Sequence, residues 1–497
     1  MAGLVPAIHA LPRARENVDA RDKPGHDDRP RTMPVRLKLR DIAFFERPVH
    51  FARPFRFGAI TINATPQLFV RVEIEVEGRG GAVGASAELL VPKWFDKRPE
   101  LSPAQTVDDL RRSLEIARGL YLARTGFLTA FDLHASCIGA QVATCAKKNI
   151  PALAAAYGPA EIDKAILDAL LRAAETNFFD GMAGNIAGMD ARLSPDLKET
   201  DLTIFLTGRK PLLRVAIRHT VGLDDTVEGE GGVADARENS GARYFKLKLS
   251  GDPVADAARL ARIGKELDAL EHDYKVTLDA NEQYADLAAL QELIDRLDHD
   301  TALRSISSRL LYVEQPMPRD VTRQSPLGSL AARGFIIDEA DDSYDAFPAA
   351  RALGYHGISS KSCKGLYKSI VNATRAAKWS AGGEKFFVTG EDLTCQAGLA
   401  VQQDLALGAF VGITHAERNG HHYVDGFGDT PAAEAQAFAA AHPDLYADAG
   451  QGIRLSIHHG DLLTGSLHTT GFATSVHPDW SALRPLEQPK SLQEQSA

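Results

Sequence analysis

Five short apolar segments in the second half of the chain each end in an acidic or a basic residue. These residues are Lys248, Asp279, Glu314, Asp338 and Lys361, and they are separated by steps of 31, 35, 24 and 23 residues. A β-strand with its returning helix needs about 30 residues, so the charges fall once per strand–helix unit, at the carboxyl end of the strand. Active sites of (β/α)8 barrels lie at that end. The spacing therefore predicts that the five side chains share one barrel mouth.

Three of these residues are carboxylates, which would repel one another and raise each other's pKa if they lay alone in one mouth. A divalent cation removes this conflict. Oxygen-only ligands favour Mg²⁺, with Mn²⁺ as the alternative, over Zn²⁺. We therefore expect Asp279, Glu314 and Asp338 to form a metal site. Glu339 follows Asp338 directly and is the alternative third ligand.

The two lysines indicate proton transfer. Lys248 and Lys361 end the second and the sixth predicted strands, which face each other across an eight-stranded barrel. Shielding from water disfavours the ammonium form of a lysine, so the side chain can act as a base near neutral pH. Two such bases could remove the proton next to a substrate carboxylate and return one from the opposite face, while the metal stabilises the enediolate. Lys364 is the alternative to Lys361 as the second base.

Five motifs resemble those of the enolase superfamily, specifically its muconate-lactonizing-enzyme-like or mandelate racemase-type branch. They are Lys246-Leu247-Lys248, Asp279-Ala280-Asn281, Val313-Glu314-Gln315-Pro316, Asp338-Glu339 and Lys361-Ser362-Cys363-Lys364. The resemblance covers roughly residues 35 to 425. It implies a capping domain before the barrel, a metal held by Asp279, Glu314 and Asp338, acid/base roles for Lys248 and Lys361, and a pKa-setting role for Lys246. The family usually has Gly-Gly after the lysine that corresponds to Lys364, and this sequence has Gly365-Leu366 there.

Other polar residues are candidates for contact with the substrate. A segment of aromatics and arginines, residues 51–58, is predicted to be a loop whose Arg53 or Arg56 covers a substrate carboxylate. Asn281, Glu391 and Asp392 follow apolar strands and are expected to face the mouth. His415, directly after the predicted last strand, is expected to serve as an additional acid.

The chain divides into four predicted parts: a disordered or non-native leader (1–32), an α+β capping domain (33–211), the barrel (212–430) and a C-terminal extension (431–497). In the capping domain, an alternating strand over 67–76 and a return strand from residue 82 predict a hairpin, and residues 103–200 read as helices. The eight predicted barrel strands are 213–219, 244–249, 275–279, 310–314, 334–338, 357–361, 385–388 and 410–414. A strand over 453–457 is predicted to return to the capping domain.

Composition restricts the class of protein. The formal net charge is −10, which argues against a nucleic-acid partner, and no apolar run approaches the roughly 20 residues of a membrane span. The four scattered cysteines form no disulfide framework or metal pair, which favours a cytoplasmic protein. No Gly-x-Gly-x-x-Gly follows a strand, which argues against a dinucleotide enzyme.

The combined prediction is a Mg²⁺-dependent enzyme that acts on a small carboxylate, and the opposed lysines favour a racemase or epimerase. The same residues also suit a dehydratase of a hydroxy acid or a cycloisomerase. A catalytically silent barrel that binds a carboxylate is the non-enzyme alternative. Relatives of this kind commonly assemble, so we expect a homo-oligomer.

Overall fold

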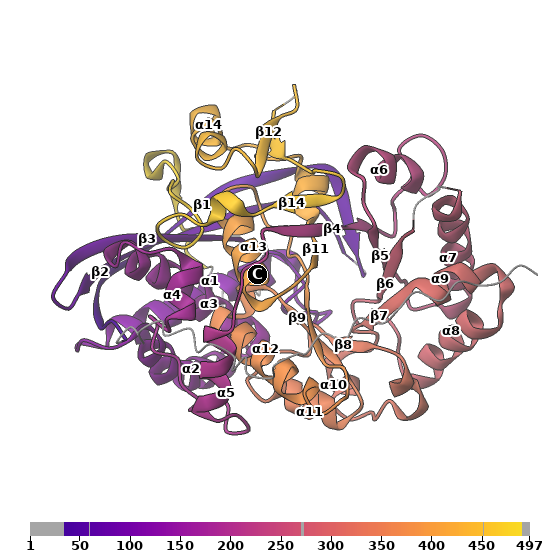
Figure 1. The fold of residues 1–497 in the computed structure, drawn as a ribbon, viewed down its shortest axis with the longest axis horizontal. Coiled ribbons are helices and arrows are strands. Elements are labelled where there is room, and N and C mark those ends of the chain that lie inside the picture. The colour runs from indigo at the N-terminus through magenta and orange to yellow at the C-terminus, as the bar shows by residue number, and fades with distance from the viewer. Residues whose placement is uncertain (1–33, 59, 270–272, 451, 490–497) are drawn as a thin grey trace, which may run out of the picture. The chain divides into compact units, whose positions relative to one another are not determined.

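The structure is a computed structural model that describes residues 34–58, 60–269, 273–450 and 452–489. The predicted leader, residues 1–32, lies outside the described residues. The described chain forms an antiparallel sheet domain with helices, followed by a closed barrel of eight parallel strands (Figure 1). The expected fold class, a (β/α)8-type barrel with an α+β capping domain, is confirmed.

The capping domain is built on a three-stranded meander. β1 (Leu37–Phe57) pairs with β2 (Ile60–Val76), and β2 pairs with β3 (Gly80–Leu89). The buried helix α3 (Ala152–Ala173) packs on this sheet so closely that a Cβ on Gly84 would lie 2.2 Å from the carbonyl oxygen of Ala165, so this strand position requires glycine. The domain's other helices are α1 (Pro103–Leu122), α2 (Ala130–Ala146), α4 (Phe178–Ala183) and α5 (Glu199–Thr207).

The prediction of a loop over residues 51–58 is wrong, because this segment is the end of β1. Phe55 lies opposite Ile62 and Phe57 opposite Ile60 across the hairpin. Both phenylalanine side chains are buried whereas Arg56 between them is exposed, as a strand with one covered face requires. The hairpin therefore extends in β-structure to its tip.

The barrel consists of strands β4 to β11, and β11 pairs with β4 to close it. Their bounds are β4 (Arg214–Val221), β5 (Tyr244–Lys248), β6 (Lys275–Asp279), β7 (Leu310–Glu314), β8 (Phe335–Ile337), β9 (Gly357–Ser360), β10 (Phe387–Gly390) and β11 (His415–Glu417). The helices are α6 (Val233–Ser240), α7 (Pro253–Asp268), α8 (Leu287–His299), α9 (Arg304–Arg309), α10 (Arg319–Thr322), α11 (Ala346–Ala352), α12 (Leu366–Ser380) and α13 (Leu399–Val411).

The last barrel strand does not occupy residues 410–414, as predicted, but His415–Glu417. Phe410 is a buried residue at the end of α13, and Gly412, with φ of 93°, ends that helix in the left-handed region. A short apolar run does not distinguish a buried helix end from a strand, which explains the error.

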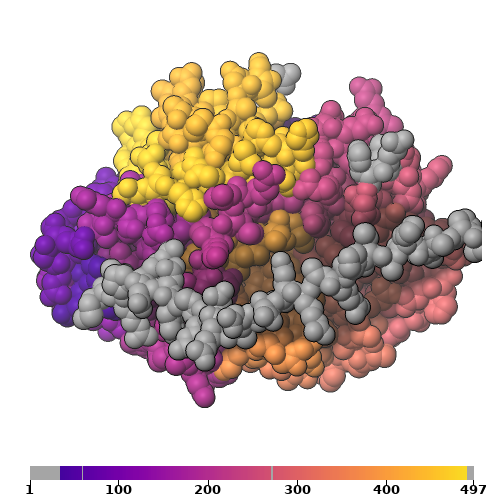
Figure 2. Space-filling view, viewed as in Figure 1, coloured from indigo at the N-terminus to yellow at the C-terminus, as the bar shows by residue number. Residues whose placement is uncertain are grey.

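The C-terminal extension contacts both domains. Its elements are α14 (Ala432–Ala441), β12 (Tyr446–Asp448), β13 (Ile453–Leu455), β14 (Asp461–Leu463) and β15 (Arg484–Pro485). β14 pairs with β4 of the barrel, and β15 pairs with β1 of the capping sheet. The extension thus reaches the capping domain, but through β15 and not through the predicted strand 453–457, because β13 pairs with β12. Figure 2 shows this extension in yellow on the surface.

Candidate active site

The strand-end charges meet inside the barrel mouth. Lys246 and Lys248 point inward from β5, because they alternate with the outward-facing Phe245 and Leu247. Backbone register places Lys248 beside Asp279, the last residue of β6. Asp279 is in turn beside Glu314 at the end of β7, Asp338 directly follows β8, and Lys361 directly follows β9. All of these side chains are buried.

Lys246 lies at the centre of a cage of carboxylates. Its Nζ is 2.9 Å from Asp279 Oδ2, 2.9 Å from Glu314 Oε2, 2.7 Å from Glu391 Oε2 and 3.1 Å from Glu417 Oε2. Burial disfavours its ammonium form, but the four carboxylates outweigh this cost and raise the pKa of Lys246 well above its usual value. Lys246 is therefore a permanent cation and not a base.

Lys248 is held by two acceptors at the mouth. Its Nζ lies 2.5 Å from Asp279 Oδ2 and 2.7 Å from Asn281 Oδ1. The amide of Asn281 donates to Glu339 Oε1 at 3.1 Å, and Lys97 of the capping domain donates to the same oxygen at 2.7 Å. A hydrogen-bonded chain thus runs from the capping domain through Glu339 and Asn281 to Lys248.

Lys361 approaches the mouth from the other side. Its Nζ lies 2.6 Å from Asp338 Oδ2 and 4.1 Å from the ring centre of Trp94 of the capping domain. Burial disfavours the ammonium form, but the Asp338 carboxylate outweighs burial and raises the pKa of Lys361. Lys364 instead lies 2.7 Å from Ser359 Oγ, 3.3 Å from Asp338 Oδ1 and 3.0 Å from an oxygen of Asp341, and does not line the mouth cavity.

The mouth cavity is small and covered by the capping domain. Its volume is about 20 Å³, enough for a single water-sized group. Residues from both domains line it: Phe55, Phe57, Val91, Trp94, Lys246, Lys248, Asn281, Lys361, Asp392, Leu393, Thr394, Glu417 and Asn419. The two candidate bases therefore face one small cavity, and the side chains that the capping domain contributes to its wall are apolar or aromatic.

The tip of the β1–β2 hairpin forms the lid of this cavity. The ring of Phe55 packs on Tyr423 with ring centres 4.2 Å apart, and Arg56 pairs with Asp224 of the barrel at 2.9 Å. Neither Arg53 nor Arg56 lines the mouth cavity. Arg53 and Arg56 are exposed, whereas Phe55 and Phe57 face the mouth.

The two carboxylates after β10 have different surroundings. Glu391 is enclosed below the mouth, where Lys246, Arg218 and Tyr312 contact it. Asp392 lines the mouth cavity, and burial raises its pKa to about 6. Only Asp392 is therefore placed to contact a substrate.

His415 lies away from the mouth. It begins β11 rather than following the last strand, and its Nδ1 lies 2.8 Å from a guanidinium nitrogen of Arg218. Burial and then the Arg218 charge lower the pKa of His415 to about 3. The predicted role of His415 as an acid required a strand that ends at residue 414. Because β11 extends to residue 417, Glu417 reaches the mouth instead.

Sequence reasoning missed the capping-domain residues Trp94 and Lys97. Both follow β3, in Val91-Pro92-Lys93-Trp94-Phe95-Asp96-Lys97. Lys97 also pairs with Glu282 at 2.9 Å. The only sequence feature that could have indicated these residues is a tryptophan and two lysines after an apolar strand. The neighbouring sequence does not indicate which barrel residues they contact.

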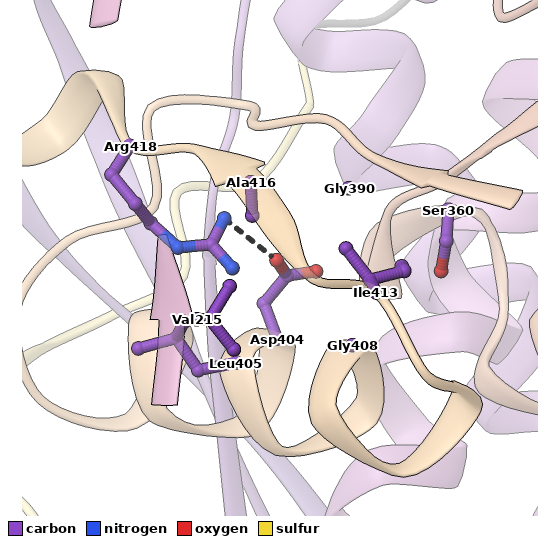
Figure 3. Close-up of a pocket in the computed structure, with 9 residues that line it drawn as sticks. All are labelled: Val215, Ser360, Gly390, Asp404, Leu405, Gly408, Ile413, Ala416 and Arg418. Atoms are coloured by element: carbon purple, nitrogen blue, oxygen red, sulfur yellow. Dashed lines mark ion pairs between the residues drawn. The ribbon is translucent and has the colours of Figure 1, made fainter. Parts of the chain in front are cut away.

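A second buried cluster supports the loop after Lys361 from behind. The backbone N–H of Ser362 donates to Asp404 Oδ1 at 2.9 Å, and Lys164 of α3 contacts Ser362 Oγ at 3.4 Å. Figure 3 shows Asp404 paired with Arg418, at 3.1 Å. The segment that carries Lys361 is therefore fixed by charges from both domains.

Lys164 is itself enclosed between two buried glutamates. It lies 2.9 Å from Glu161 Oε1 and 3.9 Å from Glu88 Oε2, and none of the three side chains reaches solvent. Burial is the main cause that raises the pKa of Glu88 to about 8 and that of Glu161 to about 7. One lysine thus compensates one ionised glutamate, and the more distant Glu88 stays protonated at neutral pH.

The carboxylates of the mouth suit a divalent cation in their chemistry. Within the described residues, no group of three or more His, Cys, Asp or Glu side chains is already arranged to hold a metal ion, since lysine ammonium groups lie among the acids. Glu314 Oε2 lies 2.9 Å from the Lys246 ammonium and has no hydrogen-bond partner among the described residues besides this ion pair. Burial and the charges of Asp279 and Glu391 raise the pKa of Glu314 well above its usual value. This centre is short of positive charge, and its buried oxygen donors fit Mg²⁺.

The capped barrel is the fold of the enolase superfamily. No protein-family model and no curated protein matches the sequence. Among solved structures, a muconate lactonizing enzyme from Mycobacterium smegmatis is 17% identical with a TM-score of 0.57, over 89% of this chain and 98% of that one. A dipeptide epimerase from Enterococcus faecalis V583, complexed with Mg and L-Leu-L-Tyr, is 16% identical with a TM-score of 0.56, over 88% and 99%. A superfamily member from Roseovarius nubinhibens ISM, complexed with magnesium, is 18% identical with a TM-score of 0.55, over 91% and 99%.

Proposed function

We propose that this protein is an enzyme that removes the proton next to the carboxylate of a small molecule and returns a proton to the same carbon, as a racemase or epimerase does. The observation that carries the proposal is that Lys248, at the end of β5, and Lys361, directly after β9, line one cavity. A carbon between them would have a proton donor or acceptor on each face. The Mg-bound dipeptide epimerase of the same fold supports this reaction type.

A divalent metal is part of the proposal, and Mg²⁺ suits the donors best. Asp279, Glu314 and Asp338 would hold it, because they are buried carboxylates from three successive strands. When bound, the metal would stabilise negative charge on the substrate carboxylate. Two of the magnesium-bound structures of this fold support this choice.

The chain's own residues have separate tasks in this proposal. Lys248 and Lys361 exchange protons with the substrate carbon, because a buried lysine relieved of its counter-charge becomes a base. Lys246 keeps four carboxylates together as a fixed cation. The hairpin tip excludes water through Phe55 and Phe57, which strengthens the electrostatic interactions inside.

The wall of the cavity indicates a substrate with an apolar side group. The capping domain presents only Phe55, Phe57, Val91 and Trp94 to the mouth. A polyhydroxylated acid would leave those of its hydroxyl groups that face the capping domain without partners, at a cost of about 1–3 kcal/mol each. We therefore propose apolar or aromatic α-substituted carboxylates as the substrate class.

Deuterium exchange tests the proposal. The protein is incubated in D₂O with Mg²⁺ and single enantiomers of such carboxylates, and the α-proton is followed by NMR. We expect exchange by the unaltered protein, loss of exchange from one enantiomer in Lys248→Met and from the other in Lys361→Met, and retained exchange in Lys364→Met. Loss of water from a hydroxy acid would instead identify a dehydratase. Absence of exchange with every acid of the class, in protein shown to bind Mg²⁺, would contradict the proposal.

No helix in the parts of the chain that the structure describes is long and apolar enough to cross a membrane.

A further inference from the structure

A cavity of about 710 Å³ lies outside the barrel, beside the first strand. It is lined by the hairpin end of β1, by β4, by α6 with the loop before it, by the short π-helix η4 (Gly420–Val424), and by residues of β13 and after it. Along β4, Arg218 and Thr220 point into the barrel, where they contact Glu391 and Glu417. His219 between them points out into this cavity, so β4 separates the cavity from the mouth.

Basic side chains from four segments converge on this cavity. They are Arg53 of β1, His219 of β4, His421 and His422 of η4, and Arg454 of β13. The ring centres of His219 and His422 are 4.6 Å apart. His421 Nδ1 is buried and has no hydrogen-bond partner among the described residues. Burial, followed by the charges of its basic neighbours, lowers the pKa of His219 well below its usual value and that of His421 to about 4.

The acidic groups of the same cavity already have donors. Asp224 pairs with Arg56 at 2.9 Å, and Asp225 accepts the hydroxyl of Tyr423 at 2.8 Å. Asp235 accepts a backbone N–H at 2.6 Å. The cavity's acids are therefore satisfied within the protein, whereas His421 Nδ1 is buried and has no hydrogen-bond partner among the described residues.

We propose that this cavity binds a small organic oxyanion, a phosphate- or carboxylate-bearing molecule, between Arg53 and the histidines of β4 and η4. Its volume falls within the roughly 300–1,000 Å³ of small-molecule sites. Apolar side chains, among them Val221, Val233 and Ile457, provide room for a carbon skeleton beside the charged end. An oxyanion could accept a hydrogen bond from His421, whose buried Nδ1 has no other partner among the described residues, and its charge would favour the protonated form of the histidines beside it.

Protonation and binding are coupled in this site. Because an anion favours the imidazolium form, it raises the pKa of any histidine it contacts and takes up protons as it binds. The groups that face the histidines are Arg53 from β1, Asp225 from the loop before α6, and Arg454 from β13. Affinity should therefore rise as the pH falls from about 8 to about 6.

Calorimetric titration of the full-length protein with inorganic phosphate and, separately, with citrate tests the site without added metal. We expect one saturable site for at least one of these anions, tighter near pH 6 than near pH 8. His421→Asn combined with His422→Gln should weaken binding about tenfold or more, the loss of a charge-assisted hydrogen bond. His299→Gln, at an exposed histidine that ends α8, is the matched control and should bind normally.

The outcomes are distinguishable. Binding of phosphate alone identifies a phosphate-bearing ligand, and binding of citrate alone identifies a polycarboxylate. Binding that is lost in Lys361→Met but kept in the double histidine variant would place the anion in the barrel mouth and overturn the proposal. No saturable binding of either anion by unaltered protein would also overturn it. NMR of the histidine ring protons keeps the test valid if the double variant misfolds, because phosphate should raise the pKa of these histidines in unaltered protein.

Discussion

Replacing Glu88 by glutamine should stabilise the protein, and more so as the pH rises. Glu88 is fully buried beside one lysine that a second glutamate, Glu161, already compensates. Its pKa is raised from 4.5 to about 8, chiefly by burial. Between these two values the folded protein keeps a proton that the unfolded chain releases, so stability falls with rising pH through that window and levels off above it. A glutamine side chain at this position has no carboxyl proton to lose, so the substitution removes this dependence.

The size of the effect follows from the same two values. Each pH unit inside the window costs the unaltered protein about 1.4 kcal/mol of unfolding free energy. From about pH 5 to about pH 8, the advantage of Glu88→Gln should therefore grow by about 3–4 kcal/mol. Urea unfolding at both pH values measures the difference through the change in midpoint at constant slope.

Glu161→Gln is the matched variant and should act in the opposite direction. It removes the carboxylate 2.9 Å from Lys164 and leaves only Glu88 at 3.9 Å, and breaking a buried ion pair costs up to about 3–5 kcal/mol. An advantage of Glu88→Gln that is the same at both pH values, or a loss of stability equal to that of Glu161→Gln, would refute the assignment of Glu88 as the protonated partner.

Three further changes test the lid and the capping contacts. Asp224→Ala breaks the exposed ion pair with Arg56, so it should cost under about 1 kcal/mol of stability. It should nevertheless speed amide hydrogen exchange at the hairpin tip. Unchanged amide exchange would show that the pair does not hold the lid. Trp94→Ala should lower the free energy of unfolding in urea by about 3–5 kcal/mol, because it opens a cavity over Lys361 and removes a cation–π contact. A decrease under about 1 kcal/mol would mean that the ring is not packed. Lys97→Met should destabilise the protein by about 3 kcal/mol or more, because it leaves the buried Glu339 carboxylate without its cation, whereas Glu282 keeps Arg319. Equal stability in urea would contradict the bridge between domains.

The charges on the barrel strands were predictable, because two regular features fix them. A strand–helix unit recurs about every 30 residues, and side chains alternate along a strand. These rules place Lys248 beside Asp279 and Asp279 beside Glu314, as the backbone register has them. The prediction for His415 was wrong for a related reason. The apolar run that ends α13 was interpreted as the last strand, which placed His415 after that strand instead of at its start.

Contacts that depend on tertiary packing were not predictable. Nothing near Trp94 or Lys97 in the sequence indicates that they reach Lys361 and Glu339, more than 240 residues away for each pair. The cage around Lys246 likewise draws on four different strands. Such contacts are decided by how the capping domain docks on the barrel and by how the barrel closes.

This division has a consequence for the proposed chemistry. Hydrogen-bonded strands hold the carboxylates and the two lysines that we propose as proton donors and acceptors, so the relative positions of these side chains change little when side chains of the cap are substituted. The apolar wall that a substrate meets comes from β1 and from the segment after β3, which contact the barrel through side chains such as Arg56 with Asp224 and Lys97 with Glu339. Substitutions at Phe55, Phe57 or Val91 should therefore alter which carboxylate is accepted while deuterium exchange itself persists. Substitution of either lysine at the strand ends should instead remove exchange from one enantiomer of every carboxylate that the protein accepts.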